Sequence, residues 1–161
     1  MHAALSVTFL SDWLIASGLG DGVLADAVLV RDHDGLPWIP GRALKGALRE
    51  GAHRLAQARP DLKRAENLFW GTRNTELDTN RSGLLRVSAA RLPDSLRQAL
   101  REAAPEEREA LVRDLTVIRR QTALDERGNT IDHSLRASEC GMAGLTFTAE
   151  LDLCLPEDLD L

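Results

Sequence analysis

Two prolines and three glycines are crowded into the stretch GLPWIPGRALKGALR at residues 35–49, and this stretch constrains the local fold more than any other. Pro37 and Pro40 fix the backbone φ angle and remove two hydrogen-bond donors, which excludes a strand centre and favours a stiff extended turn. Gly41 then permits a close approach of backbone or ligand. The stretch therefore predicts a sharply turned entry into a helix.

The helix that follows is expected to cover Gly41–Ala58. Apolar residues recur there with helical spacing, while the basic residues Lys45, Arg49 and Arg54 fall largely off the apolar stripe. The unpaired amides at a helix amino end attract phosphate, and Arg42, Lys45 and Arg49 would extend that positive field. The alternative is an ordinary strand-to-helix connection with a solvated basic face. The stretch lacks the pattern of a nucleoside-triphosphate loop.

Strands and helices interleave along the rest of the chain. Alternating or β-branched residues predict strands, and two periodic segments split at Pro105 predict short surface helices. The predicted strands cover residues 5–13, 27–31, 84–90, 116–122 and 145–155, the predicted helices 94–103 and 106–115, and loops or turns 15–26, 32–35, 71–83 and 125–132. This pattern indicates an α+β domain with an antiparallel or mixed sheet.

The charge distribution is uneven. A net charge of −5 argues against a nucleic-acid binder if the chain is taken as a whole. Residues 41–64, however, hold seven positive side chains against two carboxylates, whereas residues 148–161 hold five carboxylates and no cation. The basic segment around the helix is therefore the place where a polyanion would bind.

Membrane and metal functions find little support. No apolar run approaches the ~18 residues that span a bilayer, and the amino terminus reads as a strand rather than a leader, so we expect a cytoplasmic protein without a membrane partner. Cys140 and Cys154 are too few for a disulfide framework or a metal site. We expect both to be buried, reduced thiols.

The stretch GLPWIPGRALKGALRE, preceded by DAVLVRD and followed by LFWG, resembles the amino-terminal signature of the repeat-associated mysterious proteins, the RAMP superfamily of CRISPR effector subunits. The shared features are a glycine, a proline, Ile-Pro-Gly, Leu-Lys-Gly and an arginine at these spacings. GLLRVSAARL at 83–92 resembles the family's following strand, and residues 122–151 resemble its hairpin insertion and return strand. The resemblance covers most of the chain and is strongest at residues 20–50.

This resemblance implies a ferredoxin-like, RRM-like palm with an antiparallel sheet and hairpin (thumb) insertions, formed by residues 1–161 as one domain. Longer family members continue into a second half with a glycine-rich loop, so a chain shortened relative to them is expected. The implied partners are a CRISPR guide RNA, a single-stranded target RNA and other subunits of a type III effector complex. The implied RNA contacts are Gly41, Arg42, Lys45 and Arg49 on the helix and Arg119, Arg120 and Arg136 beside the hairpin, although a plain charged strand would also explain the last three.

The resemblance also suggests a catalytic residue. In backbone subunits of type III effectors that cut target RNA, a loop aspartate lies six residues before the aspartate that ends the second strand. Asp32 ends that strand here, so Asp26 takes the catalytic position, with a divalent cation such as Mg²⁺ as cofactor. The alternative role for Asp26 is to satisfy backbone amides at the strand start. Asp21 is a second candidate in the same loop, although its spacing does not fit.

Other residues admit two interpretations each. His33 between Asp32 and Asp34 fits a metal or acid–base site, but turn composition explains all three residues. The three tryptophans, Trp13, Trp38 and Trp70, could stack on bases or pack in the core, and the scarcity of aromatic residues favours the core.

Three functions remain in competition. The leading one is a guide-RNA-binding backbone subunit that also cleaves target RNA, and the second is a purely structural subunit of the same complex. The third is an endoribonuclease that processes the precursor transcript. That reaction usually needs a histidine or tyrosine as general base. The absence of tyrosine counts against it.

Overall fold

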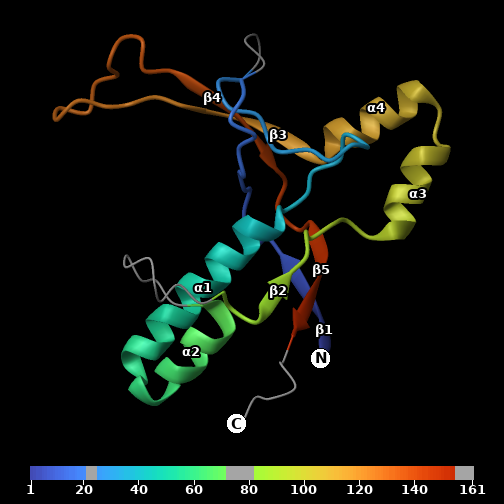
Figure 1. Ribbon diagram of the computed structural model, residues 1–161. Helices are drawn as coiled ribbons and strands as arrows, with labels where there is room; N and C mark the ends of the chain where they lie inside the picture. The colour runs from blue at the N-terminus through green and yellow to red at the C-terminus, as the bar shows by residue number, and fades with distance from the viewer. Residues whose placement is uncertain (21–24, 72–81, 155–161) are drawn as a thin grey trace. The chain divides into compact units, whose positions relative to one another are not determined.

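The computed structural model describes residues 1–20, 25–71 and 82–154 (Figure 1). Helices and antiparallel strand pairs alternate along the chain, which confirms the predicted α+β class. In chain order the elements are β1 (His2–Thr8), α1 (Gly41–Ala58), the 3₁₀ turn η1 (Pro60–Leu62), α2 (Lys63–Trp70), β2 (Leu85–Val87), α3 (Asp94–Glu102), α4 (Pro105–Asp114), β3 (Thr116–Gln121), β4 (Arg136–Gly141) and β5 (Thr146–Leu153).

The chain divides into two compact units, each assembled from separate segments. Unit 1 comprises Met1–Ser6, Ile39–Ala90 and Thr148–Leu161, and unit 2 comprises Val7–Trp38 and Arg91–Phe147. The expectation of a single domain over residues 1–161 stays a prediction.

Unit 1 combines α1 and α2 with most of a three-stranded sheet in the order β1-β5-β2. β2 pairs antiparallel with β5, so that Leu85 lies opposite Leu153 and Val87 opposite Leu151. Helix α1 packs against both β2 and α2. Leu44 is buried on α1, as the apolar stripe predicts.

Gly41 begins α1 at a place where no side chain fits. A Cβ atom added there would lie 2.5 Å from the carbonyl oxygen of Val87 and 2.9 Å from the carbonyl carbon of Ser88. Pro40 at the cap and Gly41 together bring the helix end directly onto the backbone of β2. The predicted sharp entry is therefore explained by a backbone contact within unit 1.

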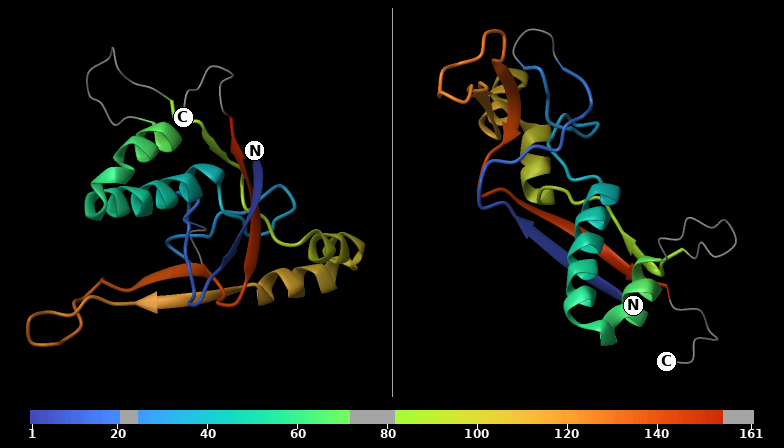
Figure 2. Two further views of the ribbon diagram at one scale, coloured as in Figure 1. Left: turned by 90° about the horizontal axis from the view of Figure 1, so that it is seen from below. Right: turned by 90° about the vertical axis from the view of Figure 1, so that its left-hand side faces the viewer.

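Unit 2 contains a long hairpin and an aromatic core. β3 and β4 pair antiparallel from Thr116 opposite Gly141 to Gln121 opposite Arg136, and they run side by side in the left view of Figure 2. Trp13, which is 6% exposed, stacks on Phe9 with ring centroids 4.3 Å apart and meets Phe147 edge-on at 5.3 Å. Trp13 is thus a core residue, while Trp38 and Trp70 are half-buried.

The structure departs from the predicted elements at several points. Residues 27–31 form isolated bridges rather than a named strand, because Ala27 bridges β4, whereas Leu29 and Arg31 bridge loop segments. β1 ends at Thr8 rather than near residue 13. Sequence periodicity missed α2. The prediction of buried thiols is correct for Cys140 and wrong for Cys154, which is exposed.

No helix among the described residues is both long and apolar enough to cross a bilayer. Some predicted features lie outside those residues: Asp21, most of the polar loop at 71–83, and three carboxylates of the acidic end, Glu157, Asp158 and Asp160.

Replacing Gly41 with alanine is expected to lower the free energy of unfolding by about 1–3 kcal/mol, because the new methyl group must displace the backbone of β2. Gly46 on the same helix is the matched control, since a Cβ there meets nothing within 4 Å. Gly46→Ala should stabilise the protein by up to about 1 kcal/mol through its helix propensity. Urea unfolding of both variants checks the contrast, and equal effects at the two positions would contradict it.

Candidate nucleic-acid interface

The basic residues of α1 do not form a uniform solvated face. Lys45 is half-buried and donates from Nζ to the carbonyl oxygen of Leu85 at 2.7 Å, at the start of β2. Arg49 donates to the carbonyl oxygen of Gly71 at 3.2 Å, just after α2. Arg42 is exposed and has no hydrogen-bond partner among the described residues. Two of the three basic side chains predicted to contact RNA therefore help to hold unit 1 together, and Arg42 faces solvent.

Asp26 is fixed against the hairpin by two hydrogen bonds. Its carboxylate Oδ2 accepts from the amide of Ala137 at 2.8 Å, and its own amide donates to the carbonyl oxygen of Ala137 at 2.8 Å. The bridge between Ala27 and Ser138 continues this parallel pairing. The carboxylate thus satisfies a backbone amide, as one of the two interpretations of Asp26 expects, and it is also exposed at the root of β4.

The three hairpin arginines occupy different environments. Arg119 pairs with Asp12, whose other carboxylate oxygen accepts from the amide of Ala143 at 3.1 Å. Arg120 is exposed and has no hydrogen-bond partner among the described residues. Arg136 is exposed and, within the described part of the chain, donates only to nearby backbone carbonyls, the closer at 3.1 Å.

The pairing register puts three of the predicted residues, Asp26, Arg120 and Arg136, near the same end of the β3–β4 ladder. Ala137, which holds the Asp26 carboxylate, lies opposite Arg120 and directly follows Arg136. All of these residues belong to unit 2. Within unit 2, the proposed catalytic carboxylate therefore lies beside the tip-side end of the β3–β4 ladder, where Arg120 and Arg136 extend from opposite faces of the strand pair.

A second cluster gathers around the turn at residues 32–34. The Asp32 carboxylate is 2% exposed and accepts from Arg91 at 2.9 Å and from Arg97 at 2.7 Å. The Asp34 carboxylate accepts from Arg97 at 2.7 Å and from Arg101 at 2.8 Å. Arg97 on α3 therefore bridges both carboxylates. Sequence reasoning missed these arginines, and the spacing of Arg97 and Arg101 by four residues was the available signal.

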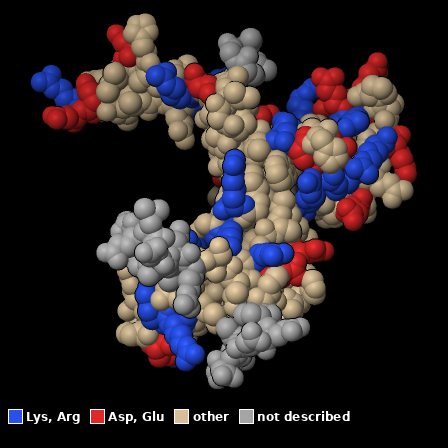
Figure 3. All heavy atoms as spheres, in the orientation of Figure 1, with Lys and Arg blue, Asp and Glu red and all other residues tan. Residues whose placement is uncertain are grey.

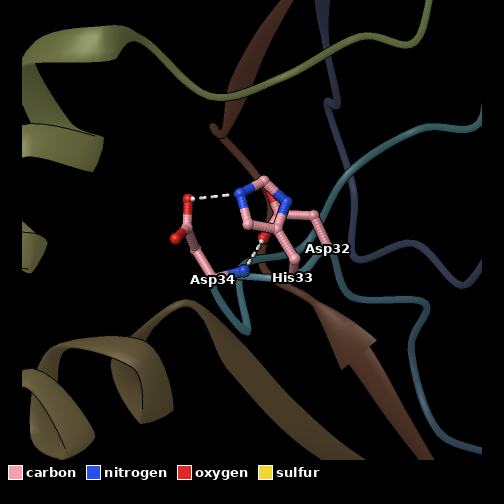
Figure 4. Close-up of side chains that lie close together, drawn as sticks. All are labelled: Asp32, His33 and Asp34. Carbon is pink, nitrogen blue, oxygen red and sulfur yellow. Dashed lines mark hydrogen bonds and ion pairs between the residues drawn. The ribbon is translucent and has the colours of Figure 1, made fainter.

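His33 does not complete a metal site in this arrangement. Figure 4 shows the His33 ring facing the Asp34 carboxylate, with Nε2 3.5 Å from Oδ2, and ligand atoms of Asp32, His33 and Asp34 lie within 4.8 Å of one another. Arginines already balance both carboxylates, and the Asp32 carboxylate accepts from the Asp34 amide at 2.9 Å. Turn chemistry and ion pairing thus account for the three residues.

The acidities of the two carboxyl groups follow from these contacts. Burial alone would raise the pKa of Asp32, but hydrogen bonds from Arg97 and from two backbone amides outweigh it and hold that pKa below its ordinary value. The hydrogen bond from Arg101 lowers the pKa of Asp34 in the same direction. Both groups are therefore carboxylates at neutral pH.

Asp32→Asn is expected to lower the free energy of unfolding by about 1–3 kcal/mol at neutral pH, because it removes one of the two carboxylates that the buried Arg97 bridges. Since the folded pKa lies below the unfolded one, the stabilisation is present above about pH 4 and is lost as pH falls through the folded pKa. Urea unfolding at a series of pH values should show the difference narrowing in acid. Asp132→Asn, at an exposed position, is the control. A difference that stays constant into strong acid would contradict the assignment.

Comparisons with known proteins locate the fold. One family model, described as the RAMP superfamily, matches residues 6–157. The solved structure described as "Cryo-EM structure of the Type III-B Cmr-beta bound to cognate target RNA" contains a similar chain, with a TM-score of 0.72 and 12% identity over 98% of this chain and 85% of that one. A chain in "Type III-B Cmr-beta Cryo-EM structure of the Apo state" gives a TM-score of 0.75 and 11% identity over the same shares. No curated protein matches the sequence.

Proposed function

The chain belongs to the RAMP superfamily, and from this premise we propose that it is a guide-RNA-binding backbone subunit of a type III CRISPR effector that also cleaves single-stranded target RNA. One observation carries the proposal: the Asp26 carboxylate is held on the Ala137 amide of β4, directly across the ladder from Arg120, whose exposed guanidinium has no hydrogen-bond partner among the described residues. The similar chains in Cmr-beta complexes, one of them bound to target RNA, support it. The function implies other effector subunits as partners and a cytoplasmic location.

The cleavage chemistry follows from the arrangement around Asp26, beside the tip-side end of the β3–β4 ladder. The ribose 2′-oxygen attacks the adjacent phosphorus and loses its proton, the bond from phosphorus to the 5′-oxygen breaks, and that oxygen leaves with a proton. The products are a 2′,3′-cyclic phosphate and a 5′-hydroxyl. Oδ2 of Asp26 is held by the Ala137 amide, so Oδ1 is the atom that orients the 2′-hydroxyl. Arg120, opposite Ala137, would stabilise the phosphate oxygens, and Arg136, on the other face of the ladder, would hold a neighbouring phosphate.

The site offers one carboxylate, that of Asp26, to a divalent cation. Mg²⁺ keeps several waters and is bound through one or two carboxylates together with substrate phosphates. Asp26 supplies one such carboxylate, and its fixed orientation at β4 suits that role. When bound there, Mg²⁺ would neutralise charge that develops on the phosphate.

The basic residues of α1 would contribute to guide binding to unequal extents. Arg42, next to Gly41, is exposed and can offer its whole guanidinium fork to phosphate. Lys45 and Arg49 each donate one N–H group to a backbone carbonyl and keep further N–H groups that can bind phosphate. We therefore assign phosphate contact mainly to Arg42, with Lys45 and Arg49 in supporting positions.

A purely structural subunit is the second candidate. The observation that favours it is the hydrogen bond between Asp26 and the Ala137 amide, which gives the carboxylate a structural role without any chemistry. A processing endoribonuclease is less favoured, because the chain has no tyrosine and His33 lies among ion pairs.

Asp26→Asn distinguishes the first two candidates. The amide side chain keeps an oxygen that can accept from Ala137, so the fold and RNA binding should persist. Target cleavage by the assembled effector is expected to fall by about 100-fold or more, the usual contribution of a positioned acid–base or metal-binding group. Gel analysis of labelled target RNA measures it, with Asp132→Asn as control. Unchanged cleavage would leave the structural subunit as the better account.

Removing the hairpin charges tests guide binding. The double variant Arg120→Gln, Arg136→Gln should flatten the dependence of log K on log salt by about 0.7 for each single-strand phosphate that is no longer neutralised. Fluorescence anisotropy with labelled guide RNA over a salt series gives the slope. Arg113→Gln, at a 73% exposed arginine of α4, is the control and should leave the slope unchanged. A slope equal to that of the wild type would remove these arginines from the interface.

A further inference from the structure

Four arginines converge on the turn at residues 32–34, and together with that turn they are named the arginine cluster. Arg91 precedes α3, Arg97 and Arg101 lie on α3, and Arg108 lies on α4. Three of them bind the carboxylates of Asp32 and Asp34, while Arg108 donates to the backbone carbonyl of Asp34 at 2.8 Å. All of these residues belong to unit 2.

The arginine cluster carries more positive charge than its own carboxylates balance. Four guanidinium groups surround the carboxylates of Asp32 and Asp34, and Asp94 at the start of α3 also attracts Arg101, so positive charge remains in excess within the cluster. Figure 3 shows arginine side chains gathered at the surface around α3 and α4, with carboxylates between them. A fully buried cluster with such an excess would be strongly destabilised, but here two of its members reach solvent, so an anion from outside can supply the missing charge.

Arg101 and Arg91 are members that reach solvent, with side chains 56% and 40% exposed. Among the described residues each makes one hydrogen bond, from a single terminal nitrogen, which leaves four of the five N–H donors on each guanidinium. Arg97, only 9% exposed, bridges both carboxylates and serves as the support. The residue that supports the cluster is thus distinct from the two residues that are available to bind a ligand.

The exposed guanidinium groups are also held in place before any ligand arrives. The carboxylates of Asp32 and Asp34 anchor one edge of each fork, and the Arg91 guanidinium lies 5.2 Å from the centre of the Trp38 ring. An arginine that is already ordered loses less conformational entropy on binding, which favours affinity. The planar fork matches two oxygens of a phosphate or carboxylate group.

We propose that the arginine cluster is a second phosphate-binding site, at which Arg91 and Arg101 grip the sugar-phosphate backbone of the single-stranded RNA bound by this subunit. The arginine cluster lies on α3 and the turn before α1 and is separate from the site at Asp26. It rests on the proposed function, because that function supplies the RNA. Polynucleotide is favoured over an acidic protein surface since the two arginines present separate forks, which suit successive phosphates.

Nearby acidic residues limit how the site works. Glu102 accepts from Gln98 at 2.8 Å, and Glu109 lies 3.9 Å from Arg113, so carboxylates of α3 and α4 offset the field of the arginine cluster. Long-range attraction of RNA is therefore weak here. The site acts by contact, with a salt dependence that corresponds to one or two phosphates rather than to a broad basic face.

The test uses the full chain and a fluorescein-labelled oligouridylate, followed by anisotropy over a salt series. The double variant Arg91→Gln, Arg101→Gln should flatten the slope by about 0.7 for each phosphate that these arginines neutralise in the wild type, up to about 1.4 in total. Arg113→Gln is the control for charge on the same helical region. Thermal unfolding confirms that each variant is folded, since Asp32 and Asp34 keep Arg97 as a partner.

A conservative variant separates charge from geometry. Arg101→Lys keeps the positive charge but loses the fork, so the salt slope should stay near that of the wild type while affinity falls. If Arg101→Lys lowers the melting temperature as much as the double glutamine variant does, the weaker binding results from unfolding. The arginine cluster is then purely structural, and the proposal is overturned.

The outcomes also separate this proposal from the proposed function. If the hairpin double variant flattens the slope and the cluster variant does not, the proposed function stands and the second site is refuted. If the wild-type chain binds no oligouridylate and the effector binds no guide, both fail. If the cluster variant keeps its RNA slope but no longer assembles with the other effector subunits, the arginine cluster binds an acidic protein surface instead, and the phosphate assignment is overturned.

Discussion

A carboxylate withdrawn almost completely from water organises the turn that precedes α1. Asp32 has a side chain 2% exposed, and one of its oxygens accepts from two backbone amides while the other accepts from Arg91 and Arg97. Burying an ion is unfavourable unless every lone pair finds a donor. Only one arrangement of the turn, helix α3 and the loop at Arg91 is therefore stable, because any other arrangement leaves a buried charge without a partner.

This constraint explains how a loop-rich unit acquires a defined structure. Unit 2 has few long elements, and its aromatic core of Phe9, Trp13 and Phe147 is small. Ion pairs between distant segments supply the remaining order: Arg31 meets Glu139 at 2.6 Å, and Arg119 meets Asp12. Glu139 also accepts from the amide of Leu29 at 3.2 Å. In unit 2, carboxylate oxygens accept hydrogen bonds from backbone amides that would pair with a neighbouring strand in a regular sheet.

The sequence predicted helix α1 but could not predict the side-chain contacts that its basic residues make. The bounds of α1 were predictable, because prolines, a glycine and a 3.6-residue period all act locally. The partners of Lys45 and Arg49 were not, since these are backbone carbonyls 40 and 22 residues away, and every residue carries such a group. The pairing of Arg97 with Asp32 spans 65 residues and leaves no local pattern. Asp26 entered through family resemblance, and its carboxylate's hydrogen bond with an amide was one of two expected roles.

The position of Asp26 depends on main-chain atoms of Ala137 and not on any side chain of the hairpin. Backbone pairing is indifferent to residue identity, so the protruding tip between residues 122 and 135 is free to diverge in length and composition. Lineages that face different nucleic-acid geometries could remodel that tip, and protein engineers could graft new tips onto it, without displacing the acidic group at its base.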